Sequence, residues 1–101
     1  MISQFVIKIQ AKGYQDYNHP YYNRSYNFSL LKTYKVTPKA YQYVHQNNVI
    51  TPRYEWYDCG VEMAYNETLI ISGVLQNNVP ATDYCFIIIK GEDNIRRFDG
   101  F

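Results

Sequence analysis

Hydrophobic and polar side chains alternate along two segments in the first third of the chain. Alternation with a period of two is typical of a strand that is buried on one face. Residues 2–12 and 25–36 both show this pattern, so each segment predicts a strand. The inward positions of the first strand would be Phe5, Ile7, Ile9 and Ala11, and those of the second would be Tyr26, Phe28 and Leu30.

A short helix is predicted directly after the second of these strands. Thr37 can cap a helix, and Pro38 is tolerated at the first helical position. The helix would run from Pro38 to about Gln46 and end at Asn47-Asn48. Its inward residues would be Ala40, Tyr41 and Val44.

A six-residue repeat gives an alternative to this helix. Residues 44–49 (VHQNNV) and 74–79 (VLQNNV) share five of six residues. If the match is structural, residues 41–46 form a strand that corresponds to residues 72–76. A repeat architecture normally needs several copies, so the helix is our prediction and the strand is the alternative.

The second half of the chain predicts further strands. Residues 53–65 and 68–76 alternate and are joined by a tight turn at Asn66-Glu67, which would make a hairpin. Residues 83–90 are the most apolar segment, as expected for a central strand with both faces buried. Residues 91–101 are predicted to be a polar C-terminal tail.

These elements predict a single domain over residues 1–101, because the length suits one modest core. The predicted fold class is α+β, with a mainly antiparallel sheet of about five strands and one short helix. The alternative is a small β-barrel of the OB type, a fold that also carries one helix and binds single-stranded nucleic acid.

The alternation stops at a stretch rich in tyrosine. Residues 13–28, GYQDYNHPYYNRSYNF, hold six aromatic side chains, and residues 13–25 are predicted to be a Tyr-rich loop. Aromatic rings beside cations can stack on the bases of single-stranded nucleic acid while the cations contact phosphates. The candidate binding residues are Tyr14, Tyr17, Tyr21, Tyr22, Arg24, Tyr26, Lys12 and Lys32. Tyrosine and arginine are also enriched at protein–protein hot spots, and these tyrosines could instead cover a thin core.

The net charge of +1 hides an uneven distribution of charged residues. Residues 1–54 contain seven cations and one acid, whereas residues 55–101 contain eight acids and three cations. The resulting charges of +6 and −5 favour an anionic partner for the basic half. Alternatively, folding interleaves the two halves and their fields cancel.

The chain is predicted to be cytoplasmic, in the host cell if it is viral. Its first residues, MISQFVIKIQAK, lack the apolar run of a signal peptide, and residues 84–89 are too short an apolar run to cross a membrane. Cys59 and Cys85 are expected to be free thiols in that compartment. Residue types with AT-rich codons are abundant, as is common in phages, archaeal viruses and low-GC bacteria.

The sequence carries no signature of catalysis, metal binding or cofactor binding. The GxxxxGK[ST], GxGxxG, HExxH and GxSxG patterns and paired Cys/His spacings are all missing. His19 precedes a proline, and His45 would lie near a helix C-terminus, where the helix dipole favours its cation. The prediction is a protein that is not an enzyme and uses no cofactor or metal.

The predicted function is therefore a small non-enzymatic binding module. Its basic, Tyr-rich half would contact single-stranded nucleic acid or a nucleic-acid-handling complex. The alternative is a phage or viral protein that inhibits a host or defence complex by protein–protein contact. Neither function implies a membrane partner, and either is compatible with a homo-oligomer.

Overall fold

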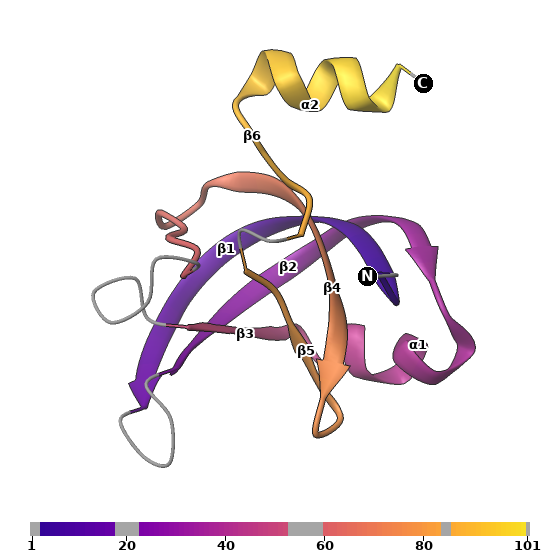
Figure 1. Cartoon of the computed structure of the whole chain (residues 1–101). Coiled ribbons are helices and arrows are strands. Elements are labelled where there is room, and N and C mark those ends of the chain that lie inside the picture. Colours follow the sequence, from indigo (N-terminus) through magenta and orange to yellow (C-terminus); the bar gives the residue numbers. More distant parts are fainter. Residues whose placement is uncertain (1–2, 18–22, 53–59, 84–85, 101) are drawn as a thin grey trace.

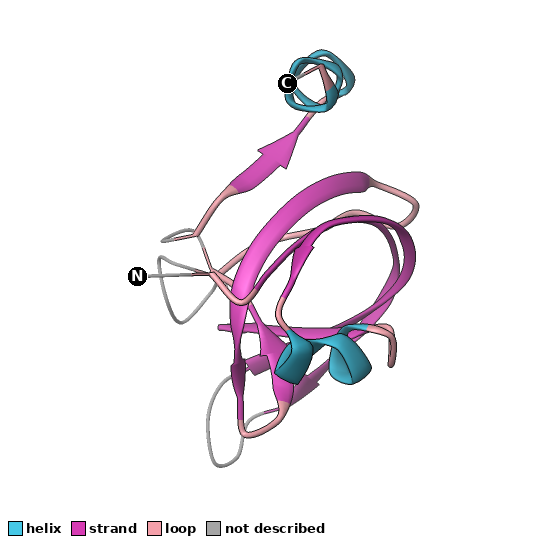
Figure 2. Cartoon of the chain, turned by 90° about the vertical axis from the view of Figure 1, so that its right-hand side faces the viewer, coloured by secondary structure: helices cyan, strands magenta, loops and turns pink. Residues whose placement is uncertain are grey.

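Five strands close into a ring, and a sixth strand extends the sheet at one edge. The computed structural model describes residues 3–17, 23–52, 60–83 and 86–100. Its elements in chain order are β1 (Phe5–Tyr17), β2 (Asn23–Val36), α1 (Pro38–Val44), β3 (Asn48–Pro52), β4 (Thr68–Gln76), β5 (Val79–Ala81), β6 (Ile88–Lys90) and α2 (Glu92–Asp99). The strand order is β1-β2-β3-β5-β4-β6, and β1 also pairs with β4, which completes the ring (Figure 1, Figure 2).

The strand pairings confirm the predicted fold class. The described pairings are antiparallel except that of β3 with β5, which is parallel. The α+β fold with a mainly antiparallel sheet is therefore correct, and the near-barrel ring also fits the OB-like alternative. The sheet has six strands rather than about five, and a second helix follows the last strand.

The predicted inward residues of β1 and β2 form the core of the ring. The buried side chains of these two strands are Phe5, Ile7, Ile9, Ala11, Tyr26 and Phe28, with Leu30 packed against them. β4 adds Leu69 and Ile71, which lie opposite Ile9 and Ile7 in the β1–β4 pairing. Period-two alternation therefore identified the side chains of β1 and β2 that fill the barrel.

Helix α1 forms at the predicted capping sequence. The Thr37 hydroxyl accepts a hydrogen bond from the Ala40 N–H at 3.3 Å, and Pro38 occupies the first helical turn. Ala40 and Val44 are buried as predicted. The prediction for Tyr41 was wrong, because its side chain is 61% exposed.

The first asparagines of the two repeats, Asn47 and Asn77, share a left-handed backbone conformation, but the repeats do not share an architecture. Asn47 has a φ of 64° just after α1, whereas Asn77 and Asn78 have φ values of 52° and 64° in the turn from β4 to β5. Asparagine tolerates this left-handed region better than most residues. Since residues 38–44 are helical, the strand alternative was wrong.

The turn at Asn66 forms, but the predicted hairpin around it does not. The Glu67 N–H donates to the Ala64 carbonyl at 3.0 Å, and the Glu67 carboxylate accepts from the Ala64 N–H at 2.9 Å. However, β4 pairs with β1, β5 and β6 instead of with residues 61–65. Val61 and Met63 nevertheless join the core.

The C-terminal region differs from the predicted central strand and polar tail. β6 is a three-residue strand at the sheet edge, where it pairs with β4. Residues 92–99 form α2, which lies outside the ring at the top of Figure 1. Acidic residues in its first turn and arginines in its last turn complement the helix dipole, which explains why so polar a segment is helical.

Candidate functional site

The predicted Tyr-rich loop is largely the far end of the β1–β2 hairpin. β1 continues to Tyr17 and β2 begins at Asn23, so only residues 18–22 lie between these strands. The pairing register shifts between Ala11 and Gly13, and Gly13 has a φ of 135°. Such a bulge changes which side chains share a face, and it places Tyr14 directly opposite Tyr26.

Tyr14, Arg24 and Tyr26 form a stack at this end of the hairpin. The Arg24 guanidinium carbon lies 3.9 Å from the centroid of the Tyr14 ring and 5.8 Å from that of Tyr26. The two rings meet edge to face with centroids 5.7 Å apart. The Tyr14 ring is thus held by a cation. Because its side chain is 56% exposed, the ring is still accessible to a ligand.

Asp16 fixes the orientation of Arg24. The guanidinium donates from Nε to Oδ1 at 2.6 Å and from Nη2 to Oδ2 at 3.1 Å. These hydrogen bonds with Asp16 are the main reason that the pKa of Arg24 is raised above its ordinary value. The two hydrogen bonds orient the guanidinium, but Asp16 neutralises the cation that was expected to contact phosphate.

Tyr26 is the buried member of the stack and belongs to the core. Its side chain is 1% exposed. Its hydroxyl accepts hydrogen bonds from the Met63 N–H at 3.1 Å and from Arg24 Nη1 at 3.2 Å. Tyr26 therefore cannot stack on a ligand in this conformation, although it was predicted as a binding residue.

Two further exposed rings lie along the second half of β1. Tyr17, a predicted binding residue, is 45% exposed near the end of β1. Tyr65 was not predicted and is 70% exposed. Lys12 Nζ donates to Asn66 Oδ1 at 2.9 Å and lies 5.9 Å from the centroid of the Tyr65 ring. Lys12 and Tyr65 thus repeat the combination of cation and aromatic ring seen at Arg24 and Tyr14.

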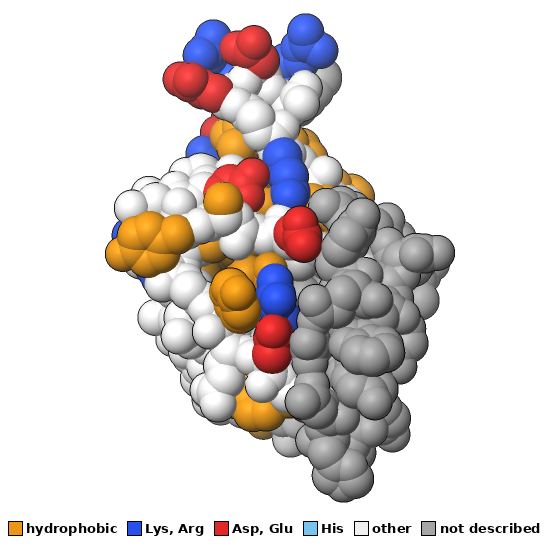
Figure 3. Space-filling model, turned by 90° about the vertical axis from the view of Figure 1, so that its left-hand side faces the viewer, with side chains coloured by type: hydrophobic (Ala, Val, Ile, Leu, Met, Phe, Trp, Pro, Cys, Tyr) orange, Lys and Arg blue, Asp and Glu red, His pale blue; other side chains and the backbone are white. Residues whose placement is uncertain are grey.

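A groove of about 300 Å³ lies beside the stack. Tyr26 and Met63 supply apolar surface, and the Lys90 ammonium donates to the Glu62 carbonyl at 2.5 Å across it. The other charged lining residues are Arg24, Glu62 and Glu67. Figure 3 shows this side of the molecule, where blue and red side chains are interspersed with orange ones. The mixture makes the surface amphipathic rather than strongly basic.

Lys32 belongs to a different cluster. Its Nζ lies 3.6 Å from Asp99 Oδ1 and 4.8 Å from the centroid of the Tyr34 ring. Lys8 Nζ contacts the other carboxylate oxygen of Asp99 at 2.5 Å. The structure therefore places Lys32 against α2 and not beside Tyr14. In these contacts, two lysines of the basic half (residues 1–54) pair with an acid of the acidic half (residues 55–101). This agrees with the alternative in which folding brings the two halves together and their fields cancel.

Several predicted positions lie outside the described residues. Tyr21 and Tyr22 fall in residues 18–22, so the structure places neither of them. The predicted free thiols, Cys59 and Cys85, also fall outside the described ranges. The free-thiol state of the two cysteines therefore remains a prediction.

Neither protein-family models nor curated protein sequences match this chain. Within the described ranges, no three His, Cys, Asp or Glu side chains gather in a way that could hold a metal ion. No helix in the described part of the chain has the length and apolar character that a membrane crossing needs.

Acidification is expected to weaken the contact between α2 and the barrel. Hydrogen bonds from Lys8 and Tyr34 lower the pKa of Asp99 below its ordinary value of 3.8. The native state thus favours the carboxylate, so the contact is intact above pH 3.8 and is lost as pH falls through the lowered pKa. The Tyr34 ring resonances, followed by NMR during acid titration, should move, and in Asp99→Asn they should already be moved at neutral pH.

Proposed function

We propose that this chain is a small non-enzymatic binding module that contacts single-stranded nucleic acid at the end of its β1–β2 hairpin. The observation that carries this proposal is the exposed ring of Tyr14, held against the Arg24 guanidinium at 3.9 Å. Stacking of a base on such a ring is tolerant of base identity, since every base has a π face.

The position of these residues in the ring of strands supports the proposal. In OB-type barrels, oligonucleotides bind at the face of the second and third strands and at the loop between the first two. Tyr14 and Tyr17 lie at the corresponding end of β1, and Arg24 lies on β2 where it pairs with β3. A strand of nucleic acid would stack on the tyrosines and place phosphates near Lys12, whose ammonium is on an exposed side chain.

A second candidate function is inhibition of another protein complex by a phage or viral protein. The observation in its favour is the pairing of Arg24 with Asp16, which removes the net positive charge from the tyrosine stack. An amphipathic surface of tyrosine and paired arginine is typical of a protein–protein hot spot. In this case the same rings would pack into a pocket of the partner.

Replacement of Tyr14 and Tyr17 by alanine tests the proposal. The double variant should bind a short labelled oligothymidine at least about tenfold more weakly, because one stacked base contributes roughly 1–3 kcal/mol. Fluorescence anisotropy at two salt concentrations measures the effect, and binding of the wild type should fall steeply with salt.

Tyr41→Ala is the matched control for this experiment. Tyr41 is 61% exposed, but it lies on α1, across the ring from the hairpin end (Figure 1). Its replacement should leave oligonucleotide binding unchanged. If the double variant binds oligothymidine like the wild type and instead loses a protein partner, inhibition is the better explanation.

A further inference from the structure

The carboxylate of Asp99, in the last turn of α2, is held by three groups on the outer side of β1 and β2. Lys8 Nζ lies 2.5 Å from Oδ2, and Lys32 Nζ lies 3.6 Å from Oδ1. The Tyr34 hydroxyl also donates a hydrogen bond to Oδ1. Lys8 and Lys32 are direct partners in the β1–β2 pairing, which brings their ammonium groups to one place. Two cations and a hydroxyl thus converge on one anion.

The residue before Asp99 completes the contact. The Phe98 ring meets the Tyr34 ring edge to face, with centroids 4.9 Å apart. The end of α2 therefore places one aromatic ring and one anion side by side on β2. A nucleotide presents the same two features, a flat ring and a phosphate with one negative charge. Phe98 and Asp99 thus contact Tyr34, Lys8 and Lys32 with the same two kinds of group that a nucleotide would offer them.

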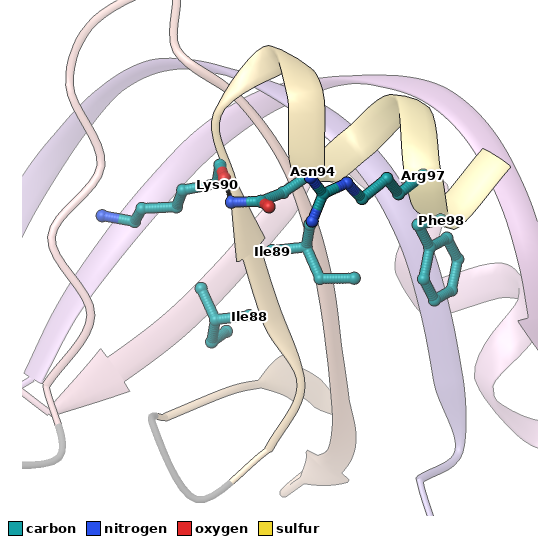
Figure 4. Close-up of a pocket in the computed structure, with 6 residues that line it drawn as sticks. All are labelled: Ile88, Ile89, Lys90, Asn94, Arg97 and Phe98. Atoms are coloured by element: carbon teal, nitrogen blue, oxygen red, sulfur yellow. Dashed lines mark hydrogen bonds between the residues drawn. The ribbon is translucent and has the colours of Figure 1, made fainter. Parts of the chain in front are cut away.

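Helix α2 is held loosely enough to be displaced. None of its side chains is buried. A groove of about 330 Å³ separates it from β6, and Figure 4 shows Phe98 extending from the helix beside this space. In the described residues, the hydrogen bonds, ion pairs and ring contacts between α2 and β1 or β2 all come from Phe98 and Asp99. Exposed ion pairs of this kind contribute little to stability.

The helix also has a hinge at its N-terminus. Gly91, between β6 and α2, has a φ of 90°, a conformation that glycine adopts without strain. The Asn94 side chain donates to the Lys90 carbonyl at 2.9 Å, and rotation about Gly91 would break this one exposed hydrogen bond. Rotation about Gly91 would lift Phe98 and Asp99 without breaking the ring of strands.

We propose that Lys8, Lys32 and Tyr34 form a second contact for single-stranded nucleic acid, which Phe98 and Asp99 cover in the free protein. This inference rests on the proposed function. A backbone phosphate replaces the Asp99 carboxylate between the two lysines, and a base replaces Phe98 against Tyr34. Lys8 lies on the outward side of β1, whereas Tyr14, beyond the bulge, shares the face of its buried partner Tyr26, so the second contact is separate from the hairpin end.

Asp99→Asn tests this inference, and Asp93→Asn is its matched control. Both changes remove one negative charge from α2, but Asp93 is exposed in the first turn and pairs within the helix, with Arg96. Asp99→Asn should bind oligothymidine about five- to tenfold more tightly than Asp93→Asn does. Its plot of log affinity against log salt should be steeper by about 0.7 for each phosphate gained. Adding Lys32→Gln to Asp99→Asn should cancel most of the gain.

The outcomes separate this inference from the proposed function. Equal binding by the Asp99→Asn and Asp93→Asn variants overturns the second contact, and the proposed function then stands if alanine at Tyr14 and Tyr17 still weakens binding. Tighter binding by Asp99→Asn with no effect of the tyrosine variants supports the second contact and removes the hairpin end as the binding surface. If no variant binds oligothymidine, Asp99→Asn included, both are overturned.

Discussion

Gly73→Ala is expected to destabilise the protein by about 3 kcal/mol or more, the upper range for overpacking a buried site. A Cβ at this position would lie 1.9 Å from the Ala81 carbonyl oxygen and 2.8 Å from Cζ of Phe5. The first contact is with backbone, so β5 would have to move away from β4. The second is with a core ring. Since β5 joins β3 to β4, this movement would open the ring of strands.

Gly100→Ala is the matched control, because it adds the same methyl group elsewhere. The nearest atoms there are the Arg96 and Arg97 carbonyl oxygens, both at the ordinary contact distance of 3.5 Å. Its φ of −81° suits any residue, so the change in unfolding free energy should stay within about 0.5 kcal/mol. Urea denaturation measures both variants. Similar midpoints for the two would show that β4 and β5 separate freely.

The parts of the fold that local patterns dictate were predictable from the sequence. Alternation in β1 and β2 identified the inward side chains, because a barrel this small is filled from one face of each of these strands. Thr37 and Pro38 marked the start of α1, since capping depends on only a few adjacent residues. Both features come from interactions between near neighbours in the sequence.

The partners of β4 and the place of β6 depend on the whole chain and were not predictable in this way. Residues 83–90 are apolar enough for a central strand, yet among the described residues of this segment the strand covers 88–90, at the sheet edge. Helix α2 carries Ile95 and Phe98 three residues apart, a helical spacing that could have indicated a helix. The high polarity of residues 92–99 led instead to the prediction of a tail. The contact of Asp99 with Lys8 joins residues 91 positions apart, so no local pattern could indicate it.

The candidate site shows a similar division. Composition drew attention to the hairpin of β1 and β2, where Tyr14 and Tyr17 are exposed. Composition alone could not separate them from Tyr26, which alternation had already placed among the inward residues. The face that Tyr14 occupies is set by the bulge between Ala11 and Gly13, which composition does not reveal. Tyr65 was missed because its turn carries no excess of aromatic residues.

Tyr26→Ala is expected to lower the free energy of unfolding by about 3–5 kcal/mol, the usual cost of deleting a large ring from a core. The residue is 1% exposed and is among the largest fully buried side chains. Tyr14→Ala removes the same side chain from the other half of the stack, where more than half of the ring is in solvent. It should cost less than about 1 kcal/mol. Thermal and urea denaturation of the two variants, compared side by side, measures this contrast.

Tyr26→Phe separates the ring of Tyr26 from its hydroxyl. The phenylalanine keeps the ring but leaves the Met63 N–H, which donates to this hydroxyl at 3.1 Å, without its acceptor. An unpaired buried N–H costs about 1–3 kcal/mol, so the phenylalanine variant should lie between wild type and Tyr26→Ala. Tyr14→Phe should match the wild type in stability. A Tyr26→Phe variant as stable as wild type would mean that water replaces the hydroxyl, and that the Tyr26 hydrogen bond is not needed to hold residues 61–64 to the barrel.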